Sequence, residues 1–263
     1  MTALSCVTSS TAACDDSLSD ADATVTTPLP KVLIAVCTLC EAENITAMLE
    51  SLRRHCSAAD LLVVDDDSSD GTAALADQFA AIDGRTHVLR RQGRGLGGAI
   101  AATMTAAIDG GYDYLVNLDA DFSHDPAAVP SLINAATRRR CDVAVGSRYI
   151  PGGRIVGWPL HRRWMSRRVN RLAIGRLGLP VSDCSGSMRC YRVAALRRMD
   201  PTSLESDGYS VLEEVLYRLH QNGSSITEVP ITFTDRTAGH SKLTPAEAVR
   251  SFWKILRMGE SDR

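Results

Sequence analysis

From Lys31 onward, short runs rich in β-branched and aliphatic residues alternate with stretches of helical pattern, and this alternation constrains the fold more than any other feature of the chain. Strands and helices that alternate at this spacing are typical of a mostly parallel sheet with helices on both faces. The sequence therefore predicts an α/β fold. The expected strands are 31–36, 60–64, 87–90, 112–118 and 142–147, with helices beginning near Asn44, Thr72, Gly98 and Pro126.

Beyond Ser147 the alternation becomes irregular. We expect a Gly/Pro loop over 150–159, helices over 161–177, 209–221 and 245–258, and strands over 188–193 and 225–233. Residues 1–30 are rich in Ser and Thr and carry four Asp and no base, a composition that predicts a disordered acidic tail. Residues 31–263 are expected to form a single domain with two halves, 31–147 and 148–263.

Carboxylates follow the second strand, in the run VVDDDSSDGT over 63–72. A tight turn with a helix N-cap would explain Ser69 or Asp70, because Ser and Asp suit both roles. It does not explain the pair Asp65 and Asp66. Ligands of such sheets bind beyond the carboxyl ends of the strands, so we predict a ligand role for this pair.

A second carboxylate pair ends the fourth strand, in LDADFSH over 118–124. Asp119 and Asp121 are two residues apart, so they lie on one side of an extended chain. Mg²⁺ and Mn²⁺ are commonly held by one or two carboxylates together with substrate phosphate oxygens. The sequence therefore predicts a divalent-cation site here; a capped turn is the alternative.

Two further motifs favour other chemistry. Gly93, Gly95 and Gly98 match the dinucleotide-binding pattern, although they follow the third strand rather than the first and lie among several Arg. Cys37 and Cys40 have the spacing of a redox site. We expect instead that Cys37 is buried and that Cys40 lines the pocket.

The segment 154–176 interleaves Arg with Trp and aliphatic residues, and the stretch 143–182 carries eight Arg and no acid. Basic amphipathic helices with Trp lie in membrane interfaces. The alternative is a solvated helix whose apolar stripe packs on the domain. We expect no nucleic-acid partner, because the net charge is −2 and few aromatic platforms accompany the Arg.

The loop TDRTAGHSKLTP over 234–245 carries Arg236 and Lys242 around a Gly. Two cations on one loop between a strand and a helix suit closure over a diphosphate, and a plain surface loop is the alternative.

Seven segments, in order, resemble the family 2 glycosyltransferases, which have the nucleotide-diphospho-sugar-binding GT-A fold. Within that family the chain is most similar to the dolichyl- or polyprenyl-phosphate mannose synthases. The matching segments are VVDDDSSDGT, GRGLGGAI, LDADFSHDP, VGSRYIPGGRIVGWPLHRR, DCSGSMRCYR, GYSVLEEVLYR and EVPITFTDRTAGHSKL. Leu39 and Ser123 depart from the family pattern, which often has Tyr and Gln at these positions.

The resemblance implies a role for each site residue. The first half, 31–147, would bind the nucleotide and the second half would bind the acceptor. The nucleotide contacts would be Thr38, Glu41, Asp66, Asp119, Ala120, Arg236 and Lys242. The ligands of Mg²⁺ or Mn²⁺ would be Asp119, Asp121 and Ser123, and the contacts of the acceptor phosphate would be Arg148, Arg162 and Ser166. The catalytic residues would be Asp121, Arg148 and Lys242.

The reaction implied is metal-dependent transfer of a hexose with inversion, most simply mannose from GDP-mannose to dolichyl or polyprenyl phosphate. The acceptor phosphate is already anionic, so no strong general base is required. A neutral acceptor such as a glycan or small alcohol would need one, for which Asp183 or Glu214 is the candidate. A nucleotide-sugar-binding module without turnover is the third reading. We expect a cytoplasmic protein at the cytoplasmic face of a membrane, where a separate membrane subunit could be its partner.

Overall fold

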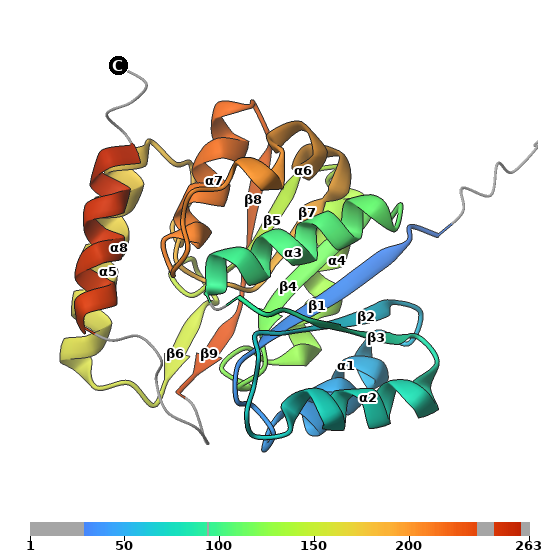
Figure 1. Cartoon of the computed structure of the whole chain (residues 1–263). Helices are drawn as coiled ribbons and strands as arrows, with labels where there is room; N and C mark the ends of the chain where they lie inside the picture. The colour runs from blue at the N-terminus through green and yellow to red at the C-terminus, as the bar shows by residue number, and fades with distance from the viewer. Residues whose placement is uncertain (1–28, 94, 236–244, 259–263) are drawn as a thin grey trace, which may run out of the picture.

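The computed structural model describes residues 29–93, 95–235 and 245–258, the side chains of 245–249 excepted. The predicted tail, 1–30, therefore lies almost entirely outside the described residues. A sheet with strand order β3-β2-β1-β4-β7-β5-β8 forms the centre (Figure 1). Its strands are β1 (Val32–Thr38), β2 (Asp60–Asp65), β3 (Thr86–Arg90), β4 (Tyr114–Asp119), β5 (Val143–Ser147), β7 (Arg189–Arg192) and β8 (Ile226–Pro230).

The sheet is mostly parallel, as the alternation predicted. Only β7 runs antiparallel to its neighbours β4 and β5 among the described strands. Successive β1 residues point to opposite faces, so Leu33 and Ala35 join one apolar core while Ile34 and Val36 join the other. Because helices cover both faces of the sheet, apolar residues occupy successive positions along its strands.

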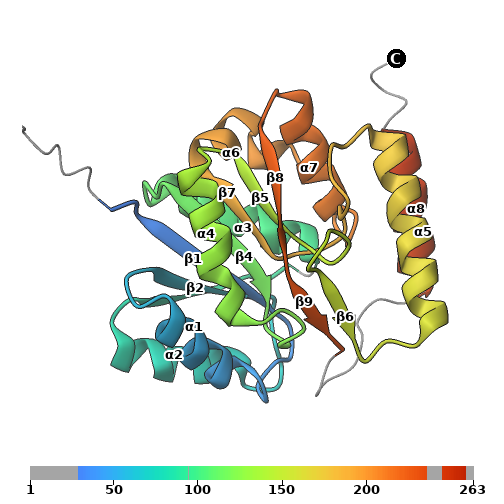
Figure 2. The same cartoon turned by 180° about the vertical axis from the view of Figure 1, so that it is seen from behind.

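Helices cover both faces of the sheet, as expected (Figures 1 and 2). One core is packed by α1 (Ile45–His55), α2 (Thr72–Asp83) and α4 (Val129–Arg138), which follows the short 3₁₀ turn η1 (Pro126–Ala128). The other is packed by α3 (Leu96–Asp109), α6 (Val193–Met199) and α7 (Val211–Gln221), with the 3₁₀ turn η2 (Pro201–Ser203) between the last two.

The second half departs from the sequence prediction at three places. The expected loop 150–159 contains the short strand β6 (Arg154–Val156), and the expected strand 225–233 is divided into β8 and β9 (Thr232–Thr234). The break falls after Pro230, and β9 leaves the main sheet to pair in parallel with β6. The third difference is α6, which begins at Val193, at the end of the predicted strand 188–193.

Two long helices lie side by side at the edge of the molecule (Figures 1 and 2). These are α5 (Leu160–Leu177) and α8 (Pro245–Met258), close to the predicted 161–177 and matching 245–258. Arg176 of α5 donates Nε–H and Nη2–H bonds to the Leu256 carbonyl, at 3.0 and 2.8 Å. In the described part of the chain, no helix has the length and apolarity that crossing a membrane requires.

Candidate active site

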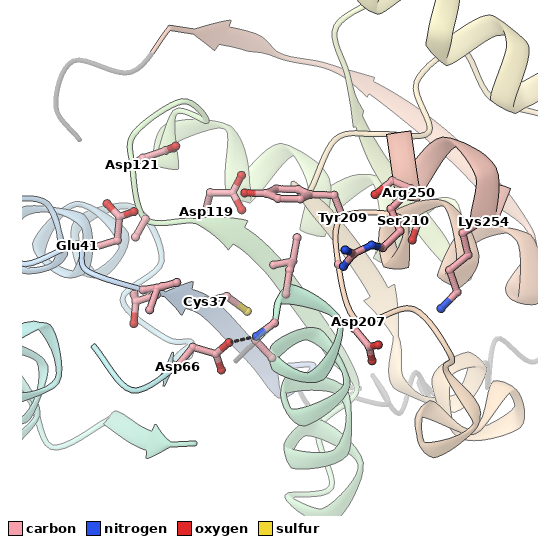
Figure 3. Close-up of a pocket in the computed structure, with 18 residues that line it drawn as sticks. Cys37, Glu41, Asp66, Asp119, Asp121, Asp207, Tyr209, Ser210, Arg250 and Lys254 are labelled. Atoms are coloured by element: carbon pink, nitrogen blue, oxygen red, sulfur yellow. Dashed lines mark hydrogen bonds between the residues drawn. The ribbon is translucent and has the colours of Figure 1, made fainter. Parts of the chain in front are cut away.

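A cavity of about 500 Å³ opens at the carboxyl ends of β1, β2 and β4. It brings together six of the residues predicted on the nucleotide and metal side, which come from three separate loops (Figure 3). These six are Thr38, Glu41, Asp66, Asp119, Ala120 and Asp121. Parallel strands end at one edge of a sheet, which is why loops distant in sequence converge here.

Asp119 and Asp121 present their carboxylates at this cavity, as the spacing predicted. Asp121 is buried and accepts a 2.9 Å hydrogen bond from the Ser123 amide. Asp119 is more exposed and accepts a 2.7 Å bond from the Ser187 hydroxyl. The buried hydroxyl of Ser123 has no hydrogen-bond partner among the described residues, so it remains available for a further contact. Two carboxylates beside an unsatisfied hydroxyl fit a small divalent cation.

The carboxylates of the second strand have separate environments. Asp65 is held by its own turn: it accepts bonds from the Ser68 amide and hydroxyl and from the Thr38 hydroxyl. The turn alternative therefore accounts for Asp65. Asp66 lines the cavity, where it pairs with Arg91 and accepts a 2.8 Å bond from the Gly95 amide. Of the predicted ligand pair, only Asp66 is placed to meet a ligand.

Of the two cysteines, Cys37 lines the cavity, where we expected Cys40. Burial beside Asp119 raises the pKa of the Cys37 thiol above the ordinary value of 9.0. Cys40 is exposed on the turn that follows, and its amide donates to the Ser68 hydroxyl at 2.8 Å. Both are free thiols, and a raised pKa disfavours the thiolate that redox chemistry needs.

The glycine-rich segment 93–98 serves backbone packing. The Gly97 amide donates to the Asp207 carbonyl at 2.9 Å, and a Cβ on Gly97 would lie 1.7 Å from the Ser206 carbonyl oxygen. A Cβ on Gly95 would lie 2.7 Å from the Asp207 carbonyl oxygen. Gly95 and Gly97 therefore let the segment 205–208 approach the start of α3, and Gly98 leaves room for the Arg91 side chain, so packing explains Gly95 and Gly98 without a dinucleotide.

The remaining wall of the cavity was not predicted as part of the site. It comes from the segment before α7 and from α8, and consists of Asp207, Gly208, Tyr209, Ser210, Arg250, Ser251 and Lys254. The Tyr209 side chain points toward Asp119 (Figure 3). The segment GYSVLEEVLYR carried part of the family resemblance, and that was the only sequence signal for this wall.

A second cavity, of about 720 Å³, lies between the β5–β6 loop and α5. Four arginines line it, together with apolar side chains from α5 and β6. The arginines are Arg148, Arg154, Arg163 and Arg167, and the apolar residues include Ile155, Val156, Leu160 and Trp164. Among the described residues, only Arg148 of these four has a carboxylate partner. The cavity therefore offers positive charge beside an apolar wall.

His124 and Phe233 form a chain of contacts between residues that line the two cavities. The His124 Nδ1 atom lies 3.8 Å from the Asp119 carboxylate, and its ring meets Phe233 edge to face at 5.1 Å. The guanidinium of Arg148 lies 5.4 Å from the same Phe233 ring. Burial lowers the pKa of His124 below its usual 6.5, so the ring is neutral near pH 7. Neither ring nitrogen has a hydrogen-bond partner within the described residues.

The three predicted acceptor residues occupy different environments. Arg148 is buried and makes two 2.7 Å bonds to Asp183 and one to the Ser185 hydroxyl. Arg162 is exposed, stacks on Trp158 at 4.0 Å and pairs with Asp235 at 3.2 Å. The Ser166 hydroxyl bonds that of Tyr149 at 2.8 Å. Only Arg148 of the three lines the second cavity.

Two of the predicted residues, Arg236 and Lys242, lie outside the described residues. The two candidate bases are described and are engaged elsewhere. Asp183 is fully buried against Arg148. Glu214 accepts from the amides of Glu205 and Ser206 and from Arg218. Neither residue lines either of the two cavities.

Comparison with known proteins places this site in a family. The model of the family described as "Glycosyl transferase family 2" matches residues 33–200. The chain is 36% identical over 234 residues to the polyprenol monophosphomannose synthase of Mycolicibacterium smegmatis, covering 88% of each protein. It is 38% identical to the undecaprenyl-phosphate mannosyltransferase of Micrococcus luteus, covering 89% of this chain and 96% of that protein.

Solved structures confirm the GT-A fold. Glucosyl-3-phosphoglycerate synthase from Mycobacterium tuberculosis, in complex with Mn²⁺, UDP and glucosyl-3-phosphoglycerate, superposes with a TM-score of 0.61. That match covers 88% of this chain and 79% of the other at 19% identity, so it concerns the fold alone. The family match and the two relatives concern the sequence itself, and together they show that this chain is a glycosyltransferase and belongs to glycosyl transferase family 2.

Proposed function

We propose that the protein transfers mannose from GDP-mannose to a polyprenyl phosphate, with inversion at the sugar and with a divalent cation in the donor site. One observation carries this proposal: side-chain contacts through His124 and Phe233 link Asp119 of a carboxylate-lined cavity to Arg148 of a second cavity that combines arginines with an apolar wall. The names of the two relatives, a polyprenol monophosphomannose synthase and an undecaprenyl-phosphate mannosyltransferase, support the same donor sugar and acceptor class.

The first cavity suits a nucleoside diphosphate that arrives with a cation. Its volume of about 500 Å³ lies within the range of nucleotide-sized ligand sites. Asp66 and Glu41 line it for the nucleoside, and Asp119 and Asp121 line it for the metal. The described residues contain no group of three His, Cys, Asp or Glu that could hold a metal by themselves. The cation would then depend on phosphate oxygens, as is typical of Mg²⁺.

Asp119, Asp121 and the Ser123 hydroxyl would hold that cation, Mg²⁺ or Mn²⁺. A bound cation would neutralise charge that develops on the departing diphosphate. The complex of glucosyl-3-phosphoglycerate synthase with Mn²⁺ and UDP supports a metal at this kind of site. We also propose that Arg236 and Lys242 cover the diphosphate, a role inferred from the family resemblance.

The second cavity suits a phosphate on an isoprenoid chain. Arginine presents a planar fork that matches phosphate oxygens, and Arg154, Arg163 and Arg167 have no carboxylate partner in the described part of the chain. Leu160 and Trp164 provide an apolar surface for the first isoprene units. Arg148 lines the same cavity, so we retain it as a phosphate contact oriented by Asp183. Arg162 and Ser166 remain proposed contacts beside this cavity.

The reaction needs positioning and charge neutralisation more than proton transfer. A phosphate monoester is anionic near neutral pH, so its oxygen can attack the anomeric carbon while the bond to the donor diphosphate breaks. The phosphate oxygen displaces GDP from the opposite face, which inverts the configuration. This agrees with the engaged state of Asp183 and Glu214, because a neutral acceptor would need one of them as a base.

A lipid-linked acceptor requires contact with a membrane surface. On α5 the exposed apolar side chains are Leu160, Trp164, Met165, Val169 and Leu172, and α8 beside it exposes Trp253. These side chains do not pack on the domain, whereas Ala173 and Leu177 near the end of the same helix do, and arginines surround the exposed ones. We propose peripheral binding of this face to anionic lipid, on the cytoplasmic side, with a separate membrane subunit as a further partner.

A panel of nucleotide sugars tests the function. The full chain is assayed with GDP-mannose, GDP-glucose, UDP-glucose and UDP-N-acetylglucosamine, a short polyprenyl phosphate, and Mg²⁺ or Mn²⁺. We expect radiolabelled mannose to enter the organic phase only from GDP-mannose, and the α-linked donor to give a β-linked product by NMR. Transfer to an aqueous alcohol or glycan would contradict the acceptor, and donor binding without any transfer would indicate a binding module.

A further inference from the structure

Helix α8 brings two cations to the donor cavity from a part of the chain that no motif marked as functional. Arg250 and Lys254 are four residues apart, so they lie on the same face of the helix. Figure 3 shows the Arg250 guanidinium extended into the cavity below Tyr209, and the Lys254 ammonium extended toward the side of the cavity that carries Asp207. The helix is fixed there by the buried side chain of Ile255 and by the bonds from Arg176 to the Leu256 carbonyl.

The charge of the cavity wall limits where a phosphate group can lie. Five carboxylates line it, from Glu41, Asp66, Asp119, Asp121 and Asp207, against the two cations from α8. Like charges repel more strongly near a protein surface than in bulk water, because the effective dielectric is lower there, so a diphosphate near the carboxylates alone would be strongly repelled. The cations of α8 therefore mark the part of the wall that favours an anion.

The two cations differ in what already engages them. The Lys254 ammonium donates to the Glu205 carbonyl, and the Glu205 amide in turn donates to Glu214 at 2.9 Å. Lys254 thereby ties α8 to the segment that carries Asp207 and Tyr209. Arg250 is exposed at the cavity and makes no hydrogen bond or ion pair with any described residue. Its five N–H donors are available to a ligand.

We propose that Arg250 binds the diphosphate of the nucleotide donor and that Lys254 is the positioning residue that holds α8 against the cavity. The assignment rests on the donor chemistry proposed above and adds a binding residue to it. Because α8 also packs on α5, the same helix joins the donor cavity to the arginine-rich face.

Calorimetric titration of the full chain with Mn²⁺ tests this role. GDP, GMP, guanosine and UDP are compared on the wild type and on Arg250→Ala, Arg250→Lys and Arg257→Ala. Arg257 is the matched control, since it is an exposed arginine on the same helix that does not line the cavity. We expect Arg250→Ala to weaken the binding of GDP about ten-fold, which is close to the usual size of a hydrogen bond to a charged group. The binding of GMP should weaken less, and the binding of guanosine should not change. Arg250→Lys should recover part of the loss.

Three outcomes would overturn the role of Arg250. The first is an unchanged affinity for GDP in Arg250→Ala. The second is an equal loss of GDP affinity in Arg257→Ala, which would indicate an effect of general charge. The third is a loss of guanosine affinity in Arg250→Ala equal to that for GDP, because guanosine carries no phosphate. A wild type that binds UDP and not GDP would contradict the proposed donor but would leave Arg250 testable with UDP. A thermal melt of each variant confirms that it is folded.

Discussion

Asp121 is buried and yet lines the donor cavity, so folding removes its carboxylate from bulk water. A buried carboxylate is costly unless a cation or hydrogen-bond donors compensate it. The Ser123 amide supplies one donor, and the Ser123 hydroxyl beside it is unsatisfied within the described residues. At the scale of single residues, this is the observation that most strongly favours a cation.

Asp121→Asn should therefore reduce sugar transfer by at least about a hundred-fold, because the isosteric amide cannot neutralise a divalent cation. Excess Mn²⁺ should not restore it. The measurement is transfer of labelled mannose to polyprenyl phosphate. Asp109→Asn is the control, since Asp109 is exposed at the end of α3. Near wild-type turnover in Asp121→Asn would disprove the metal assignment.

Arg148 and Asp183 form a buried ion pair that shapes the second cavity. Burial alone would raise the pKa of Asp183, but the hydrogen bonds and charge of Arg148 outweigh it and hold that pKa below the usual 3.8. A depressed carboxylate pKa contributes stability that is present above the unfolded-state value of about 3.9 and is lost as the pH falls toward the folded-state value.

We expect the free energy of unfolding to fall as the pH is lowered from about 5 through 4 and below, with Asp183 as one source of the loss. Asp183→Asn should be less stable at pH 7 by about 3–5 kcal/mol, because it leaves the Arg148 charge buried without its partner. The same variant should lose less stability than the wild type on acidification. Urea denaturation at several pH values measures both effects, and parallel pH profiles for the two proteins would contradict the assignment.

At the scale of elements, the donor cavity depends on how the segment 205–208 packs against the start of α3. Gly97 allows the backbones to meet, since its amide bonds the Asp207 carbonyl and any Cβ would overlap the Ser206 carbonyl oxygen. Glu214 fixes the other side of the segment through the Glu205 and Ser206 amides. Two contacts distant in sequence therefore place the wall that carries Tyr209.

Gly97→Ala should destabilise the protein by about 1–3 kcal/mol or more, because backbone must move to admit the methyl group. Gly175→Ala is the matched control. A Cβ at Gly175 in α5 meets nothing within 4 Å, so alanine should stabilise that helix by about 0.5–1 kcal/mol. Thermal melts should thus shift in opposite directions for the two substitutions. A melting temperature for Gly97→Ala equal to that of the wild type would contradict the packing role.

At the scale of the whole molecule, the charge and the exposed apolar surface are both distributed unevenly. The chain has a net charge of −2, yet residues 143–182 carry eight arginines and no acid. The same stretch includes α5, on which Trp164 is 59% exposed, and Trp253 of the neighbouring α8 is 58% exposed. A basic face with exposed tryptophan suits the interface of an anionic membrane, whatever the net charge.

Binding to vesicles should therefore require anionic lipid and weaken with salt, since the Debye length is about 8 Å at 0.15 M ionic strength. Trp164→Ser should reduce the partition coefficient about ten-fold, as expected for losing one buried aromatic side chain. Ile82→Ser is the control, because Ile82 is 90% exposed on α2, outside this face. Co-sedimentation measures all three proteins, and equal partitioning would contradict the proposed face.

Much of the donor side could be predicted because local pattern and strand direction determine it. Asp66 follows β2, and Asp119 and Asp121 lie at and just beyond the end of β4, and parallel strands in one sheet end at the same edge. Which carboxylate faces the ligand could not be predicted, since Asp65 and Asp66 differ only in the bonds they make after folding. Which of Cys37 and Cys40 lines the cavity could not be predicted for the same reason.

The sequence by itself determined the α/β class, the order of its main elements, the carboxylates of the donor side and the basic helix, because periodicity, turns and charge are local properties of the chain. Only the tertiary structure decided that β9 leaves the sheet for β6, that α8 brings Arg250 to the cavity, and that Asp183 engages Arg148. These are contacts between residues far apart in the chain, and they depend on how elements pack in space, which no local pattern encodes.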